Sequence, residues 1–196
     1  MSLANRKDDH KYTYRDYRIW TEKERWELIE GVAYDMSPSP STDHQQIVLA
    51  LANAFFNFLR GKPCQVFIAP LDVRLPEADE ADDEITSVVQ PDLFVVCDST
   101  KIDERGCKGA PDLIVEVLSP YTAQTDLKEK FDLYEKVGVK EYWLIHPVDR
   151  TVMIFTRGTD GNYGRPARYA EEGEIETAFL APLRIVLQDV FPMMSR

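Results

Sequence analysis

Two acidic side chains interrupt an otherwise apolar segment in the second half of the chain. Because the side chains of a strand alternate between its faces, Leu113, Val115 and Val117 point one way while Asp112 and Glu116 point the other. A strand that is covered on both faces is normally apolar throughout. We therefore expect Glu116 either to be buried with a partner or to lie at a functional site.

The helix expected after this strand carries two charged residues on its apolar side. Projecting residues 125–137 at roughly 100° per residue gives an apolar arc that also contains Asp126 and Lys130. The arc is formed by Leu127, Phe131, Leu133, Tyr134 and Val137. An ion pair at this i,i+4 spacing usually lies on a solvated face. Burying a charged side chain costs free energy unless it is paired with an opposite charge or takes part in function. We therefore favour a polar pocket shared by Glu116, Asp126 and Lys130.

A third acid opens another apolar strand. The phrase Pro-Asp-Leu occurs at residues 91–93 and again at residues 111–113, each time at the start of an apolar run. An aspartate in such a place often only caps a turn. If the two strands are neighbours, however, Asp92 and Glu116 can converge on one point.

Two carboxylates near a lysine suit metal-assisted hydrolysis of phosphodiester bonds. Asp and Glu oxygens hold Mg²⁺ or Mn²⁺ while leaving positions for water and a phosphate oxygen. A lysine can position that water or stabilise the charge of the transition state. Acid-plus-lysine sets are common, but the sequence offers no glycine-rich phosphate loop or zinc-ligand spacing as a competing chemistry.

The elements that position these residues indicate a single α/β domain over residues 1–196, with residues 1–12 as a flexible N-terminal arm. Residues 109–147 are typical of a βαβ unit, whose two strands are parallel and whose ligands gather where the strand ends meet the helix start. A long helix is expected from about Thr42 to Gly61. Further strands are expected at 64–68, 71–75, 88–97 and 151–156, with two short ones at 183–187 and 190–192.

The N-terminal part is less regular. A short helix is expected after Thr13, a helix or turn at residues 21–29, and a strand that is entered near Glu30 and runs to residue 36. His44 falls in the first turn of the long helix, where a histidine is more often a surface or capping residue than a ligand.

Composition limits the classes of partner. The net charge is −11, whereas tight non-specific binding of nucleic acid usually needs a basic surface. The acids are unevenly spread: residues 77–84 hold six acids and no base, which we interpret as a solvated loop, while residues 6–25 hold seven bases against five acids. No apolar run is long enough for a membrane span and the N-terminus does not resemble a signal peptide, so we expect a cytoplasmic protein.

Three cysteines complete the inventory of reactive groups. Cys64, Cys97 and Cys107 show no close metal-ligand spacing, and an odd number does not suggest a disulfide framework. We interpret all three as free thiols.

Several of these motifs together resemble one known family. They are Glu27-Leu-Ile-Glu30-Gly31, His44, Pro91-Asp92-Leu93, Asp112-Leu-Ile-Val-Glu116-Val-Leu-Ser119, Asp126, Lys130, Tyr134 and Gly138-Val-Lys-Glu-Tyr-Trp-Leu-Ile-His-Pro147. The chain from about residue 13 to residue 191 is similar to the Uma family of restriction endonucleases, within the PD-(D/E)XK nuclease superfamily. The resemblance implies a restriction-endonuclease-like mixed β-sheet core flanked by helices, with extra C-terminal strands.

The same resemblance assigns roles to residues. It implies Asp92 as the acid of the PD motif and Glu116 as the second metal ligand, with Glu30 and His44 as secondary site residues. Asp112 and Asp126 are further candidates. The lysine that the superfamily pattern places two residues after the second acid is absent, and Lys130 on the next helix is its natural substitute.

Three functions follow as hypotheses. The first is a Mg²⁺-dependent endonuclease that hydrolyses DNA as a homodimer, the dimer being expected by analogy with nucleases that cut two strands. The second is a non-catalytic interaction module that keeps the nuclease fold, which the missing strand lysine and the acidic composition favour. The third is a paired-carboxylate hydrolase acting on another substrate.

Overall fold

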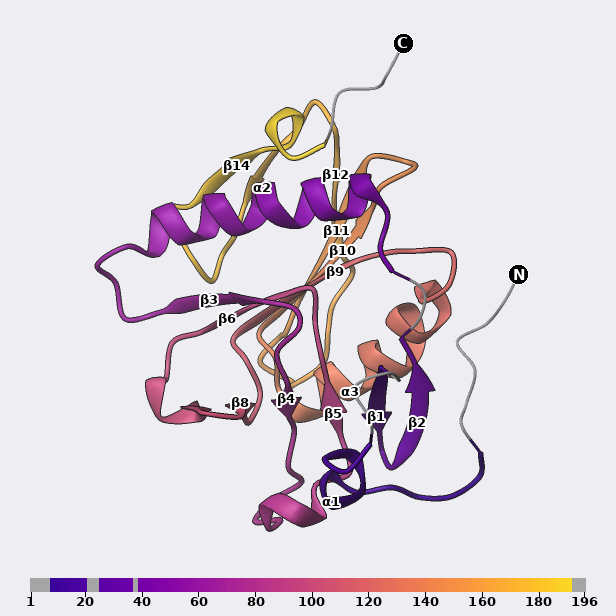
Figure 1. The fold of residues 1–196 in the computed structure, drawn as a ribbon. Coiled ribbons are helices and arrows are strands. Elements are labelled where there is room, and N and C mark those ends of the chain that lie inside the picture. Colours follow the sequence, from indigo (N-terminus) through magenta and orange to yellow (C-terminus); the bar gives the residue numbers. More distant parts are fainter. Residues whose placement is uncertain (1–7, 21–24, 37–38, 192–196) are drawn as a thin grey trace.

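A computed structural model describes residues 8–20, 25–36 and 39–191 of the chain (Figure 1). Residues 1–7 of the expected N-terminal arm lie outside this part, and at the arm's end the backbone amide of Tyr12 donates to the carbonyl of Gly31 at 2.8 Å. Within the described residues, the strands form two six-stranded sheets and a separate hairpin. The helices are α1 (Tyr14–Tyr17), α2 (Thr42–Leu59) and α3 (Lys130–Val137).

The central sheet carries the expected βαβ unit. Its order is β12, β11, β10, β9, β6, β3. These strands are β3 (Gln65–Ile68), β6 (Leu93–Val96), β9 (Leu113–Val117), β10 (Glu141–His146), β11 (Thr151–Thr156) and β12 (Ala167–Ala170). β9 and β10 are parallel, and β10 and β11 form the expected antiparallel hairpin. The expected mixed sheet with its parallel βαβ unit is thus confirmed.

The second sheet is built from shorter strands and packs around the first. Its order is β2, β1, β5, β4, β8, β7. These strands are β1 (Trp26–Ile29), β2 (Val32–Asp35), β4 (Val73–Arg74), β5 (Val88–Val89), β7 (Ile102–Asp103) and β8 (Gly106–Lys108). The C-terminal hairpin pairs β13 (Glu174–Glu176) with β14 (Arg184–Val186).

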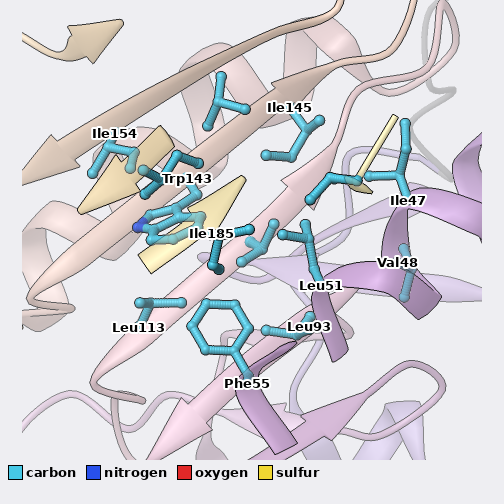
Figure 2. Close-up of a cluster of buried hydrophobic side chains, with 14 of the residues drawn as sticks. Ile47, Val48, Leu51, Phe55, Leu93, Leu113, Trp143, Ile145, Ile154 and Ile185 are labelled. Carbon is cyan, nitrogen blue, oxygen red and sulfur yellow. The ribbon is translucent and has the colours of Figure 1, made fainter. Parts of the chain in front are cut away.

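Helix α2 covers one face of the central sheet (Figure 1). Its buried side chains include Ile47, Leu51 and Phe55, which recur at helical spacing and are fully buried. Figure 2 shows Phe55 beside Leu93 of β6, and the ring centroids of Phe55 and Trp143 of β10 lie 5.5 Å apart. Burial of each such side chain contributes roughly 1.5–3 kcal/mol, so this layer holds the helix on the sheet. Ser41 caps the helix by accepting a hydrogen bond from the amide of His44.

The opposite face of the central sheet is covered by α3 and by part of the second sheet. Ile114 and Leu118 of the β9 segment point to this face, together with Leu133 and Tyr134 of α3. Glu116 lies on the same face, as the alternation of strand side chains requires. A buried carboxylate is therefore set into the apolar layer between β9 and α3.

The segment around Glu30 differs from the expected single strand. β1 and β2 form an antiparallel hairpin in which Ile29 pairs with Val32. Glu30 and Gly31 make the two-residue turn, with φ of 49° and 79°. Positive φ at both turn residues matches the twist of a hairpin and favours glycine at the second of them. The expected helix or turn at residues 21–29 is wrong over Trp26–Ile29, and residues 21–24 lie outside the described part.

The expected strand at residues 88–97 is two strands in different sheets. β5 ends at Val89 and β6 begins at Leu93. Pro91 has no backbone N–H to donate to a ladder, so it marks the point where the chain leaves one sheet for the other. Asp92 therefore enters the central sheet at the end of a connection.

The helix that follows β9 begins as a π-helix. Residues Thr125–Glu129 form this π-helical segment, and α3 continues it from Lys130. A π turn holds more residues than an α turn, so a projection at roughly 100° per residue does not hold there. Leu127, which that projection placed in the apolar arc, is 48% exposed, whereas Asp126 and Lys130 are buried as expected.

One further expectation was wrong and another was incomplete. Cys64 and Cys97, which follow α2 and β6, form a disulfide, and Cys107 is the free thiol. The acidic segment is not only a solvated loop, since Asp82 accepts from the buried Arg74 at 2.7 Å and from Arg105 at 3.0 Å. Cross-strand proximity and a buried arginine are both products of the tertiary fold, so neither was visible in local spacing.

The C-terminal strands were only partly anticipated. β14 lies within the expected strand at 183–187, but Val190 and Phe191 follow a short 3₁₀ helix (Leu187–Asp189) and are not in a strand. Both belong to the buried apolar cluster that also contains the core residues of α2, which explains their apolar character. Among the described residues, no helix has the length and apolar character needed to cross a membrane.

Candidate functional site

The register of the central sheet brings Asp92 and Glu116 together. β6 and β9 are antiparallel, with Leu93 opposite Val115, so the residue before Leu93 lies beside the residue after Val115. The amide of Val117 donates to Oδ2 of Asp92 at 2.8 Å, and the amide of Asp92 lies 3.4 Å from Oε2 of Glu116. The two acids far apart in the chain thus meet at one end of the sheet.

Lys130 forms the centre of a buried charge cluster. Its Nζ atom lies 2.9 Å from Oε1 of Glu116, 2.9 Å from Oε2 of Glu27 and 3.4 Å from Oδ1 of Asp126. All four side chains are buried, at 3–6% exposure. The predicted pocket of Glu116, Asp126 and Lys130 is therefore formed, with one acid more than sequence reasoning placed there.

Glu27 is that additional acid. Its Oε1 atom accepts the backbone amide of Gln90 at 2.8 Å, two residues before Asp92, while its Oε2 atom contacts Lys130. Glu27 therefore connects the lysine to the backbone that leads into Asp92. The sequence signal that could have identified Glu27 was the alternation of side chains in β1. Trp26 and Leu28 face one apolar cluster, and Glu27 faces the other side.

Two tyrosines add hydrogen bonds to the cluster. The hydroxyl of Tyr134 donates to Oε1 of Glu116 at 3.0 Å, and the hydroxyl of Tyr142 donates to the backbone carbonyl of Asp126 at 3.0 Å. Oε1 of Glu116 is thus held by both Lys130 and Tyr134. This leaves Oε2 of Glu116 as the oxygen directed toward Asp92.

Burial and mutual charge shift the pKa values of the cluster. Burial raises the pKa of Glu116 well above its ordinary value, although the Lys130 ammonium opposes this effect. Burial also raises the pKa of Asp126 to about 6. Burial would lower the pKa of Lys130, but Glu116, Glu27 and Asp126 outweigh it and raise that pKa well above its ordinary value. Lys130 therefore stays charged, and a proton is held most readily by the carboxylates.

His44 joins this site from the first turn of α2. Its Nε2 atom lies 3.1 Å from Oδ2 of Asp92. Its Nδ1 atom is buried and has no hydrogen-bond partner among the described residues. Oδ2 of Asp92 takes the contacts from both His44 and Val117, so both fix the orientation of this carboxylate.

A cavity of about 800 Å³ opens over these residues. Five of the lining residues are the candidate site residues His44, Asp92, Glu116, Asp126 and Lys130. The remaining walls come from the residue before β1, the segment between β2 and α2, the first turn of α2, the loop after β3, the loop after β9 and the turn after β10. The catalytic candidates thus share one solvent-accessible space.

Two predicted site residues lie elsewhere. Glu30 is exposed at the hairpin turn, where its Oε1 atom pairs with Nζ of Lys136 at 2.7 Å. Asp112 lies at the opposite end of β9 from Glu116, where it accepts the amide of Cys97 at 2.7 Å and pairs with Lys140 at 2.7 Å. Neither lines the cavity, and both contacts are structural.

The donor set suits a hard divalent cation. Among the described residues, no group of three or more His, Cys, Asp or Glu side chains is arranged to hold a metal ion. Asp92 and Glu116 nevertheless line the cavity as a pair, and the buried Oδ1 atom of Asp126 accepts no hydrogen bond from the described residues, its contact being the ion pair with Lys130 at 3.4 Å. Two carboxylates with the remaining positions left to water and phosphate oxygens is a usual arrangement for Mg²⁺. The residues therefore fit the ion.

The chain is similar to several known proteins. The model of the family described as "Uma2: Putative restriction endonuclease" matches residues 14–186. The uncharacterized protein slr1290 of Synechocystis sp. is 27% identical over 156 residues, which are 78% of each chain. A second uncharacterized Synechocystis protein, sll1609, is 23% identical over 160 residues, covering 80% of this chain and 86% of the relative.

A solved structure shows the same fold. The structure of a "putative nuclease belonging to DUF820" from Anabaena variabilis superimposes with a TM-score of 0.71 at 20% sequence identity. The match covers 91% of this chain and 97% of that one. The similarity therefore extends over most of the fold.

Proposed function

Because the chain belongs to the Uma2 family of putative restriction endonucleases, we propose that it is a metal-dependent endonuclease that hydrolyses phosphodiester bonds of DNA. The observation that carries the proposal is the meeting of Asp92, Glu116 and Lys130 in the lining of one cavity. Acids and a lysine from three separate elements converge there, at a buried position where charges are costly unless they are paired or used.

Asp92 and Glu116 would hold the Mg²⁺ or Mn²⁺ ion. Three carboxylates surround one ammonium in the buried cluster, which leaves two negative charges uncompensated when all of the acids are ionised. A divalent cation beside Glu116 would balance this excess. When bound, the ion would polarise a phosphate oxygen and activate a water molecule.

The side chains of the cluster orient these acids. Lys130 and Tyr134 restrain Oε1 of Glu116 and leave Oε2 directed toward Asp92. His44 and the amide of Val117 orient Asp92 from its other side. Lys130 keeps its charge and lines the cavity, so it is placed to stabilise negative charge that develops on a substrate phosphate.

The alternative is a non-catalytic module that keeps this fold. Lys130 is bound to three carboxylates and is not on the strand of Glu116, which favours a structural role for the cluster. Titration calorimetry with Mg²⁺ and Mn²⁺ separates the two functions. Binding at millimolar metal is expected for the nuclease, and no binding at that concentration would support the module.

Cleavage by two variants tests the proposal directly. Asp92→Asn and Glu116→Gln keep the size of each side chain but remove its charge, and we expect both to lose metal-dependent cleavage of DNA. Asp112→Asn is the matched control, because Asp112 shares the strand face of Glu116 but lies at the other end. Wild-type cleavage by Asp92→Asn and Glu116→Gln would refute the assignment.

The oligomeric state and the location in the cell stay predictions. One site per copy cuts both strands of a duplex when two copies associate, as in the expected homodimer, and cuts one strand as a monomer. Light scattering of the purified chain distinguishes these forms. A cytoplasmic location is tested by fractionation.

A further inference from the structure

The walls of the cavity are largely apolar away from the charged cluster. Met36, Pro40, Pro70, Pro120 and Val148 contribute to them from four separate segments of the chain. Pockets that bind small organic groups are commonly about 300–1,000 Å³ in volume and are lined by apolar side chains with a few polar groups. This cavity, at about 800 Å³, has the size and surface of a pocket for a base and its sugar.

The charges of the cavity do not suit the backbone of a duplex. Among the described lining residues, Arg25 and Lys130 are the basic side chains, and Lys130 is already surrounded by three carboxylates. Proteins that follow a duplex backbone neutralise several phosphates with Lys and Arg. The net charge of −11 makes such a surface still less available. Arg25 can contact one phosphate, but the described lining of the cavity does not offer a series of basic side chains for successive phosphates of a backbone.

Tyr121 contributes an aromatic side chain to the lining of the cavity. Its backbone amide lies 3.3 Å from Oγ of Ser119, and its hydroxyl donates to Oδ2 of Asp35 in β2 at 3.1 Å. These contacts hold the tyrosine at its backbone and at the far end of its ring. An aromatic ring held in place is the usual platform on which proteins stack an unpaired base.

From these features we propose that the cavity binds an unpaired nucleotide of a DNA single strand, stacked on Tyr121, and that intact duplex is a poor substrate. The inference rests on the proposed function, because it names the substrate class of the same site. A base inside a duplex is stacked and paired, so it reaches such a cavity only after unstacking. A single strand presents its bases without that cost.

Binding by fluorescence anisotropy tests the inference without cleavage. An oligonucleotide of about 12 residues is measured in the presence of EDTA as a single strand and in a duplex of the same sequence. We expect the single strand to bind at least about ten-fold more tightly, and Tyr121→Ala to weaken that binding about ten-fold. Tyr121→Phe keeps the ring and should retain most of it. Phe56→Ala, which removes a half-exposed ring on the outer side of α2, is the matched control and should bind like wild type.

The outcomes separate this inference from the proposed function. Equal or tighter binding of the duplex overturns the inference, as does a Tyr121→Ala variant that binds the single strand as tightly as Tyr121→Phe. Cleavage with Mg²⁺ is then measured on both substrates. Efficient cutting of duplex alone overturns the inference and keeps the nuclease, whereas selective binding of single strands with no cutting keeps the inference and overturns the nuclease.

Discussion

The ammonium of Lys130 lies 2.9 Å from Oε1 of Glu116, although the two residues are 14 positions apart and belong to a helix and a strand. Both side chains are almost completely buried, and each is the other's principal counter-charge. Charged side chains are retained at buried positions when they are paired with an opposite charge or take part in the function of the protein. This pair therefore links the stability of the fold to the chemistry of the cavity.

Removing the ammonium should unbalance the cluster. We expect Lys130→Met to lower the free energy of unfolding by about 3–5 kcal/mol, because it leaves three buried carboxylates without a counter-charge. Cleavage should fall to background as well. Urea denaturation measures the first effect. Lys128→Met on the same helical segment is the control, since Lys128 is exposed and its pair with Glu129 spans 3.9 Å. Equal stability of the two variants would contradict the buried cluster.

Glu27 should act by positioning Lys130. Glu27→Gln keeps a hydrogen-bond acceptor for the amide of Gln90 but loses the charge that holds the lysine. We expect kcat to fall about 10–100-fold with little change in KM. This is typical for residues that hold a catalytic side chain in position without contacting the substrate. Glu30→Gln on the same hairpin is exposed and should match wild type. A change confined to KM, or an equal fall in kcat in Glu27→Gln and Glu30→Gln, would show that this role is wrong.

The buried carboxylates should make stability depend on pH. The pKa of Asp126 is raised to about 6 in the folded state from an ordinary 3.8, so the folded chain holds this proton more tightly than the unfolded chain. The free energy of unfolding should therefore fall as pH rises from about 4 to about 6, by at most about 3 kcal/mol from this group.

Asp126→Asn tests the cause of this dependence. An amide does not titrate, so the variant should lose much of the fall in stability between those pH values, as followed by urea denaturation at each pH. Asp132→Asn is the control, because Asp132 is exposed on the same helix and should keep the wild-type profile. Identical slopes in Asp126→Asn and wild type would contradict the assignment.

Metal binding should release protons. Burial raises the pKa of Glu116 well above its ordinary value, and a carboxylate binds a cation in its deprotonated form, so metal binding should be coupled to proton release. Titration calorimetry of Mn²⁺ in two buffers with different ionisation enthalpies measures the protons released. We expect net release and an affinity that increases with pH. Binding of Mn²⁺ with an affinity that does not change with pH would place the ion elsewhere.

The alternation of strand side chains and the helical spacing of apolar residues were sufficient to predict much of this fold. Glu116 was predicted at a buried position because it interrupts an apolar strand, and Lys130 because it falls on the apolar side of a helix; the structure places both as expected. These are properties of neighbouring residues in one element. They were therefore visible in the sequence.

What could not be predicted depends on contacts between elements. Glu27 was passed over in favour of Glu30, because nothing local shows that the chain turns at Glu30 and brings β1 beside β5. The Cys64–Cys97 disulfide likewise depends on the pairing of β3 with β6. The π-helical segment shifted the face of Leu127, because its turn is wider than the projection assumed.

The central claim is that Asp92 and Glu116 hold a divalent cation beside Lys130. A crystal of the protein soaked in Mn²⁺ and measured at a wavelength where manganese scatters anomalously tests it most directly. We predict one anomalous peak in the cavity, within coordination distance of carboxylate oxygens from both Asp92 and Glu116. A fully soaked crystal with no peak there, or with its peak on other residues, would contradict the account.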